Sequence, residues 1–227
     1  MHPDIYLKQL QLGPMGNFVY LVGSLAAREC MVVDPAWSIK EITQQAAADN
    51  MKITGALVTH YHPDHVGGHL WGYDIEGLAE LIAAHPVPVY AQAAECAGIR
   101  QVTGLSVSDF KPCAPGDRIA IGDLEVTALH TPGHTPGSQC FLLGEHLVAG
   151  DTLFISGCGR VDLPGGDSDQ MYQSLAGTLA KLPGDTVLYP GHNYDGRGSA
   201  CLSEVKEINP YLSAKSLSDW RRIFGIM

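Results

Sequence analysis

The sequence predicts an α/β fold in which two sheets pack face to face with helices outside, as a single domain over residues 1–227. Short runs of apolar and β-branched residues recur along the chain between turn residues, as strands require. Several of these runs are joined by connections of hairpin length, which disfavours a doubly wound parallel sheet. Neither a linker nor a low-complexity stretch divides the chain, so we expect one domain with two comparable halves.

The first half alternates strands with helices. Predicted strands cover residues 5–10, 18–23, 30–34 and 53–58. Ser38 and Glu41 form the capping-box pattern that opens a helix, and this helix runs through Ala48 and stops near Asn50. Residues 77–84 and 93–102 are further helix candidates.

The second half begins with strands and ends with helices. Predicted strands cover residues 118–121, 124–130, 139–143, 146–149 and 186–189. Gly122-Asp123 and Gly144-Glu145 lie between them as tight-turn residues. A helix is predicted over 169–181, capped at Ser168 or Asp169, and the tail over 202–226 is expected to be mostly helical.

Composition limits the classes of partner. The formal net charge of −10 disfavours nucleic acid, because phosphate binding needs a basic surface. No apolar run reaches the ~20 residues that span a bilayer, and residues 1–10 show no signal-peptide core. Six cysteines lie far apart without a C-x-x-C pair, which favours a reducing compartment. We therefore expect a cytoplasmic protein with a small-molecule substrate and no nucleic-acid or membrane partner; a homo-oligomer stays open.

The segment THYHPDHVGG, residues 59–68, predicts a metal centre. His60 and His62 follow a predicted strand, and residues two apart in extended chain point to the same side, so both imidazoles can hold one ion. The proline that comes next turns the backbone and directs Asp64 and His65 elsewhere. These two side chains can reach a second ion about 3.5–4 Å from the first, the usual spacing in two-metal sites.

Further ligands are expected after later strands. His130 or His134 in HTPGHTPGS, Asp151 in AGDTLF and His192 in YPGHNYDG each follow a predicted strand, which brings them to one edge of the fold. Asp151 has two carboxylate oxygens and could contact both ions. The spacing leaves the choice between His130 and His134 open. Isolated histidines are more often hydrogen-bonded surface residues than ligands, so no metal role is expected for His2, His69, His85 and His146.

These four segments resemble, in order, the successive metal motifs of the metallo-β-lactamase-fold superfamily. The resemblance implies an αββα sandwich of two mixed sheets with outer helices. It also implies a ligand at His134 rather than His130, so that the ligand set is His60, His62, Asp64, His65, His134, Asp151 and His192. Asp34, in the early segment VVDPA, would then be a hydrogen-bonding structural residue.

Differences from the family patterns limit which branches of the superfamily the chain resembles. Asp151 disfavours true β-lactamases, and His62 occupies a position where flavo-diiron reductases carry glutamate. The segment GDTLF is similar to glyoxalase II, whereas GCGRVD (157–162) and YPGHNY (189–194) are similar to persulfide dioxygenases. The segment 69–88 looks like an insertion relative to either group.

The resemblance implies a metal-dependent hydrolase of a small thioester, similar to hydroxyacylglutathione hydrolase, that uses a hydroxide shared by two Zn²⁺ ions. Asp64 and Tyr194 are expected to act in catalysis, and Tyr194 and Arg160 to bind substrate; a structural salt bridge from Arg160 to Asp162 or Asp167 is the alternative. Cys158 is expected to pack as a small residue rather than act as a nucleophile, since the metal-bound water already provides one.

Two other activities stay open. A persulfide dioxygenase would hold a single Fe²⁺ with His60, His134 and Asp151, a two-histidine, one-carboxylate set. A lactonase is a more distant alternative. A non-catalytic metal-binding module is disfavoured, because a structural zinc is closed by four ligands whereas this larger set leaves positions for substrate.

Overall fold

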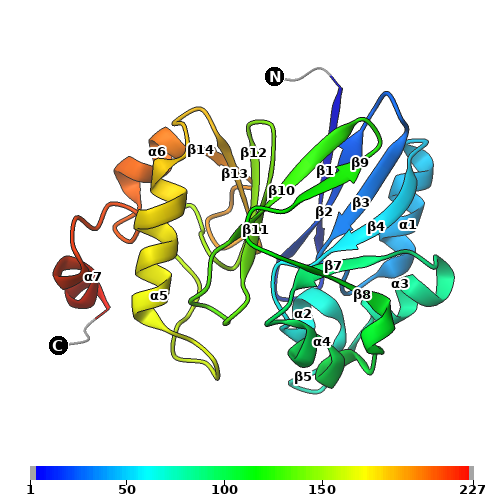
Figure 1. Cartoon of the computed structure of the whole chain (residues 1–227), viewed down its shortest axis with the longest axis horizontal. Coiled ribbons are helices and arrows are strands. Elements are labelled where there is room, and N and C mark those ends of the chain that lie inside the picture. Colours follow the sequence, from blue (N-terminus) through cyan, green and yellow to red (C-terminus); the bar gives the residue numbers. More distant parts are fainter. Residues whose placement is uncertain (1–3, 225–227) are drawn as a thin grey trace.

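Two six-stranded sheets lie between two groups of helices (Figure 1). The structure is a computed structural model and describes residues 4–224. The predictions for His2, for the first three residues of the N-terminal segment and for the end of the helical tail fall outside this range. Within it, the predicted sandwich of two mixed sheets with outer helices is confirmed.

The first sheet has the strand order β1-β2-β3-β4-β7-β8. Its strands are β1 (Ile5–Leu12), β2 (Asn17–Ser24), β3 (Glu29–Val33), β4 (Lys52–Leu57), β7 (Val89–Gln92) and β8 (Phe110–Cys113). The first three strands run antiparallel, and β3, β4, β7 and β8 run parallel. Parallel neighbours need crossovers, which are α1 (Ile39–Ala48), α3 (Leu78–Ala84) and α4 (Cys96–Thr103).

The second sheet has the order β14-β13-β12-β11-β10-β9. Its strands are β9 (Arg118–Ile121), β10 (Leu124–His130), β11 (Gln139–Leu143), β12 (His146–Gly150), β13 (Val187–Pro190) and β14 (Ala200–Cys201). Only β12 and β13 pair in parallel, through a crossover that contains α5 (Ser168–Tyr172). Helices α6 (Leu202–Ile208) and α7 (Leu217–Ile223) complete the outer layer on this side.

Three apolar layers hold the sandwich together. All eight residues of β2 are buried, because alternate side chains enter different layers. Phe18, Tyr20 and Val22 pack between the two sheets, and Val19 and Leu21 pack against the helices of the first sheet. A third layer lies between the second sheet and α5, α6 and α7, and contains Leu147, Leu175, Trp220 and their neighbours.

The structure differs from the sequence prediction mainly in the helices and short strands. The helix predicted over 169–181 is α5 followed by a π-helical segment, Gln173–Thr178, and a 3₁₀ turn, Leu179–Lys181. Its N-cap is Asp167, whose carboxylate accepts the amide of Gln170. The tail is broken after α6, since Asn209 caps that helix and Pro210 follows it.

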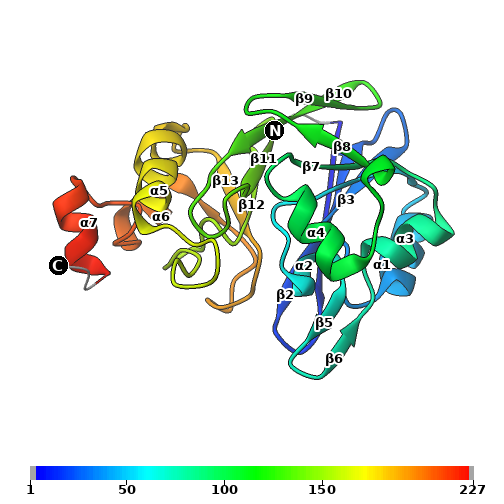
Figure 2. The same cartoon turned by 60° about the horizontal axis from the view of Figure 1, so that its bottom comes forward.

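The predicted insertion over 69–88 contains a small hairpin and a helix. Strands β5 (Gly68–Leu70) and β6 (Tyr73–Ile75) form a separate two-stranded sheet, and α3 follows. The hairpin projects from the body of the molecule beside α2 (Pro63–Val66) (Figure 2). Among the helices described in residues 4–224, none has the length and apolar character needed to cross a bilayer.

Candidate metal centre

The candidate ligands lie on loops that follow the ends of strands from both sheets. His60 and His62 follow β4, and the extended backbone of His62 (φ −64°, ψ 142°) caps the single turn of α2. Pro63 occupies the first position of this turn, where its fixed φ suits a helix and its missing N–H is harmless. The turn places Asp64 and His65 in buried positions. The other loops follow β10, β12 and β13 in the second sheet.

One group of candidate ligands consists of His60, His62 and His134. One ring nitrogen from each lies within 4.8 Å of the others. His134 Nε2 and His62 Nδ1 are 3.0 Å apart, and both rings lie edge-on to His60 with centroid distances of 4.8 and 4.7 Å. The structure therefore brings together residues that are more than 70 positions apart in the sequence.

A second group consists of Asp64, His65 and His192, again with ligand atoms within 4.8 Å of one another. The Nε2 atoms of His65 and His192 are 3.2 Å apart. Asp64 Oδ2 lies 3.5 Å from His65 Nε2 and 3.4 Å from His192 Nε2. This group joins the loop after β4 to the loop after β13.

Asp151, at the end of β12, lies between the two groups. Its Oδ2 atom is 3.7 Å from His134 Nε2 and 3.4 Å from His192 Nε2, and its Oδ1 atom is 3.4 Å from His65 Nε2. Oδ1 is buried and has no hydrogen-bond partner. A buried carboxylate oxygen without a partner is costly, and its position between the groups is suited to a cation.

Hydrogen bonds orient four of the five imidazoles so that Nε2 faces the centre. The Nδ1 atoms of His65, His134 and His192 can donate to Asp34, to the Arg160 carbonyl and to the Met15 carbonyl, at 3.0, 2.7 and 3.2 Å. Nδ1 of His60 lies 3.0 Å from Thr59 Oγ1, and its Nε2 is buried without a partner. Such bonds fix the tautomer that presents a lone pair to a metal. This set of imidazoles and carboxylates therefore suits divalent metals such as zinc and iron.

The charges differ between the two groups. Burial and the neighbouring imidazoles lower the pKa of His60, and lower that of His62 to about 4. Burial also opposes protonation of His65, but the carboxylates of Asp64, Asp151 and Asp34 outweigh it and raise the pKa to about 10. His60 and His62 are thus uncharged at pH 7 and can act as ligands, whereas three carboxyl groups surround His65.

Asp34 is confirmed as a hydrogen-bonding residue. Its Oδ1 accepts the amide of Thr59, and its Oδ2 accepts both the Thr59 hydroxyl and His65 Nδ1–H. Asp34 has a left-handed backbone (φ 52°), a conformation that short polar side chains tolerate. With its oxygens engaged, it holds the loop after β4 rather than facing the centre.

Sequence reasoning missed Glu95, a fully buried carboxylate at the N-cap of α4. Glu95 Oε2 accepts the amide of Tyr61 at 2.7 Å, and Oε1 accepts the Gly137 amide at 2.7 Å and the Thr135 hydroxyl at 2.9 Å. One side chain therefore ties the loop of His60 and His62 to the loop of His134. A Cβ atom at position 137 would lie 2.7 Å from Glu95 Cγ, so only glycine allows this approach.

Asn17, at the start of β2, was also missed. Its Nδ2 donates to the backbone carbonyl and to Oδ2 of Asp64, each at 3.0 Å. A lone asparagine or glutamate has no recognisable spacing pattern in the sequence. Asn17 reaches its position because β2 packs against α2. Glu95 reaches its position because α4 lies between two loops.

The remaining predicted site residues line a cleft of about 730 Å³ over the centre. The Tyr194 ring stacks on His192 at a centroid distance of 4.7 Å, and its pKa is raised to about 12 by burial and the carboxylates. Arg160 forms a bidentate ion pair with Asp162, at 2.9 and 2.8 Å. Burial raises the pKa of Cys158 to about 12, which makes it a poor nucleophile. His130 Nε2–H donates to the Pro136 carbonyl, and His130 lies in neither group.

A family comparison agrees with this geometry. The model of the metallo-beta-lactamase superfamily matches residues 12–192, which contain both groups of candidate ligands. The chain belongs to the metallo-beta-lactamase superfamily. The expected resemblance is therefore confirmed at the level of the superfamily and its fold.

Relatives within the superfamily divide between two chemistries. The chain is 38% identical over 201 residues to the hydroxyacylglutathione hydrolase of Hahella chejuensis, covering 85% of this chain and 69% of the relative. The crystal structure of ETHE1 from Myxococcus xanthus has a TM-score of 0.80 at 30% identity, covering 97% of this chain and 90% of that one. The di-iron-bound form of TTHA1623 has a TM-score of 0.73 at 28% identity, with 90% and 100% covered.

Proposed function

We propose that this protein is a metal-dependent hydrolase that cleaves a small thioester, of the hydroxyacylglutathione type, with two zinc ions. His60, His62 and His134 would hold one ion and Asp64, His65 and His192 the other. Asp151 would contact both. The position of Asp151, 3.4–3.7 Å from nitrogens of both groups, is the observation that carries this proposal.

The metal pair and the surrounding side chains would divide the chemistry. When bound, two zinc ions supply Lewis acidity to a carbonyl oxygen and bring the pKa of a water between them towards ~7. Asp64, held through Oδ2 by Asn17, would accept a proton of the attacking water at its other oxygen. Tyr194 keeps its proton at neutral pH, since its pKa is about 12, and would donate a hydrogen bond to substrate. Arg160 would exchange Asp162 for a carboxylate of the substrate.

Persulfide oxidation is the second candidate. The match to ETHE1 over 97% of this chain favours it, and a single iron would then be held by His60, His134 and Asp151. The second group, with Asp64 and His192 in place, would have no assigned part in that reaction. This unused group is why we place the hydrolase first. Lactone hydrolysis could use the same pair of ions and is the third candidate.

One preparation can separate these activities. Elemental analysis should find close to two zinc ions per chain, and the protein should cleave S-D-lactoylglutathione under nitrogen. The same preparation is then given glutathione persulfide and oxygen, and a lactone. One iron per chain, with oxygen uptake and sulfite formation but no thioester cleavage, would reject the hydrolase. Lactone turnover far above thioester turnover would make a lactone the substrate and leave the proposed metal centre unchanged.

A further inference from the structure

The hairpin of β5 and β6 carries an exposed tryptophan at its tip. Leu70 pairs with Tyr73, and the two residues between them, Trp71 and Gly72, both have left-handed backbones, with φ of 49° and 86°. Two positive φ angles in a two-residue loop are typical of a type I′ turn, which favours asparagine and glycine. A bulky tryptophan in this conformation is strained. Its side chain is 75% exposed, the highest value among the large apolar side chains of residues 4–224.

The base of the hairpin is fixed by backbone contacts. A Cβ atom at Gly67 would lie 2.7 Å from Gly77 Cα, and one at Gly68 would lie 2.5 Å from the Val102 carbonyl oxygen. Both glycines have positive φ, 90° and 123°. The direction of the hairpin is therefore set at its base, and the contacts of Trp71 are not needed to hold it.

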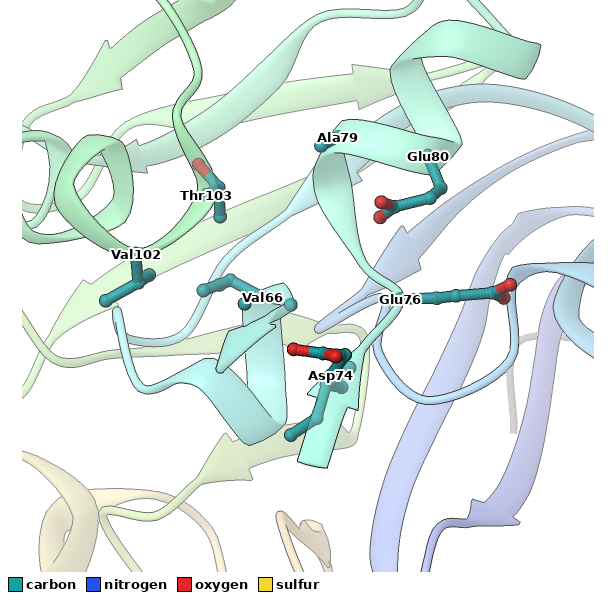
Figure 3. A pocket seen from close by; sticks show the side chains of 10 residues that line it. Val66, Asp74, Glu76, Ala79, Glu80, Val102 and Thr103 are labelled. Atoms are coloured by element: carbon teal, nitrogen blue, oxygen red, sulfur yellow. The ribbon is translucent and has the colours of Figure 1, made fainter. Parts of the chain in front are cut away.

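Behind the hairpin lies a hollow of about 280 Å³, lined by Asp74, Glu76, Glu80 and Val102 (Figure 3). Two of its three carboxylates accept backbone amides. Glu76 accepts the amide of Ile39, and Glu80 accepts the amide of Gly77. These bonds hold the segment after the hairpin to the start of α1 and cap α3, and the hollow does not contain the metal centre.

On its other side, the hairpin forms a wall of the cleft over the metal centre. Leu70 and Trp71 line this cleft together with Met15 from the loop between β1 and β2. Phe154, Tyr194 and Tyr211 line it from connecting segments in the second half of the chain. The volume of about 730 Å³ is typical of pockets that enclose a small ligand. The walls are therefore mainly apolar and aromatic above a polar floor.

The cleft has little positive charge for an anionic thiol carrier. Among residues 4–224, Arg160 is the only lysine or arginine that lines it, and its Nε and one of its terminal nitrogens both donate to Asp162. A glutathione moiety carries a net negative charge at pH 7, so this cleft offers it weak electrostatic recognition. Burial of apolar surface on the substrate would contribute more to binding than this single charge.

Resting on the proposed thioester chemistry, we propose that the hairpin is a specificity element. Trp71, with Leu70 and Met15, contacts the acyl group, so that among thioesters of the same thiol a bulky aromatic or branched acyl group is cleaved faster than a small one. The thiol part contributes little to this selection. The strained, exposed position of Trp71 is explained by contact with substrate rather than by packing within the fold.

The test is a series of thioesters that share the neutral thiol N-acetylcysteamine and differ in the acyl group: acetyl, butyryl, hexanoyl and phenylacetyl. In the zinc-loaded protein, kcat/KM should rise along the series. Trp71→Ala should reduce the ratio of phenylacetyl to acetyl kcat/KM by about tenfold or more, whereas Trp71→Phe should retain most of it. Tyr73→Ala is the matched control, since Tyr73 is an exposed aromatic residue of the same hairpin whose ring lies against Trp37.

A binding measurement separates this proposal from the hydrolase proposal. Calorimetry with the uncleavable thioether S-phenethyl-N-acetylcysteamine should give a Kd that Trp71→Ala weakens by about tenfold and Tyr73→Ala leaves within error. If no thioester is cleaved, the hydrolase proposal is wrong. The calorimetry then still tests whether Trp71 binds the apolar group. The role of the hairpin would be overturned by any of three results. These are a kcat/KM that does not change along the series, an equal loss of kcat/KM for all acyl groups in Trp71→Ala, or equal Kd values for Trp71→Ala and Tyr73→Ala. A change of oligomeric state in Trp71→Ala with an unchanged series would make the hairpin a subunit contact instead.

Discussion

The contacts of Asp64 suit it to two different roles. Its Oδ2 atom faces the imidazoles of His65 and His192 and also accepts Asn17 Nδ2–H. The carboxylate is therefore both a candidate ligand and a candidate proton acceptor. Asp64 is buried, with 6% of its surface exposed.

Replacing Asp64 should affect metal content and turnover together. We expect Asp64→Ala to lower kcat for thioester cleavage by about 10²–10⁴-fold, the range for loss of a positioned proton acceptor, and to lose the ion held by His65 and His192. Metal analysis and steady-state kinetics on one preparation measure both. His85→Ala removes an exposed histidine and is the control. A near-normal kcat with two zinc ions retained would show that Asp64 has neither role.

Glu95 acts, in our interpretation, as a positioning residue for one of the two metal groups. Burial raises its pKa, while bonds from Thr135, Gly137 and Tyr61 oppose the rise. All three donors need an acceptor. In Glu95→Gln the amide nitrogen would oppose one of these N–H groups, which disturbs the loops without removing volume.

We expect Glu95→Gln to weaken the metal held by His60, His62 and His134 by about tenfold, the lower end for residues that orient ligands. The ion at Asp64 and His192 should be retained. Competition with a chelator on the cobalt-substituted protein resolves the two affinities. Glu41→Gln, at an exposed helix position, is the control. Two results would show that Glu95 has only a structural role. One is an equal loss of affinity for both ions, and the other is lower thermal stability with unchanged metal affinity.

At the scale of elements, β1 is tied to the end of α1 by one side-chain bond. The Tyr6 hydroxyl donates to Asp49 Oδ2 at 2.6 Å, and this bond, followed by one from Gln45, lowers the pKa of Asp49. A carboxyl with a lowered folded pKa adds stability above its unfolded pKa, near 3.9, and loses it as the pH falls through the folded value.

Tyr6→Phe should therefore lower the melting temperature at pH 7, and the deficit should shrink as the pH falls below about 4, where Asp49 takes up its proton. Thermal unfolding followed by circular dichroism between pH 3 and 7 measures this difference. Tyr73→Phe, which removes an exposed hydroxyl, is the control. A deficit that stays constant across this range would mean that Tyr6 contributes through packing alone.

The elements that the sequence could predict are those with a local signal. The strand over 118–121 was predicted with the bounds of β9, because a Gly-Asp turn and alternating apolar residues mark it. Strand β7 was missed, since prolines precede it and the alanine-rich segment after it suggests a helix. The hairpin of β5 and β6 has strands of three residues, too short to show periodicity. The histidine-rich loop was found because it is dense, whereas Glu95 and Asn17 owe their roles to tertiary contacts.

At the scale of the whole molecule, the metal centre joins the two sheets. His60, His62, Asp64 and His65 follow a strand of the first sheet, and the other candidate ligands follow strands of the second. Removing the ions leaves buried imidazoles and carboxylates facing one another at 3.0–3.7 Å. Metal binding should therefore stabilise the contact between the sheets as well as the loops.

Chelation should lower the melting temperature by roughly 5–10 °C for an ion present at about 100 times its Kd. Amide exchange should rise at residues 59–65, 131–138 and 190–194, and stay unchanged in α1. Calorimetry and hydrogen-exchange mass spectrometry provide the two measurements. Asp151→Ala, which removes the carboxylate between the groups, should show a smaller response to the chelator. An equal melting temperature with and without metal would mean that the centre is fully formed without ions.

The order of the ligands along the chain has a consequence for biosynthesis. The ribosome releases the loop of His60, His62, Asp64 and His65 first, then His134 and Asp151, and His192 last. The group of His60, His62 and His134 is thus complete before β13 has been synthesised. The group of Asp64, His65 and His192 is complete only after β13. A nascent chain would therefore complete its two groups of candidate ligands one after the other.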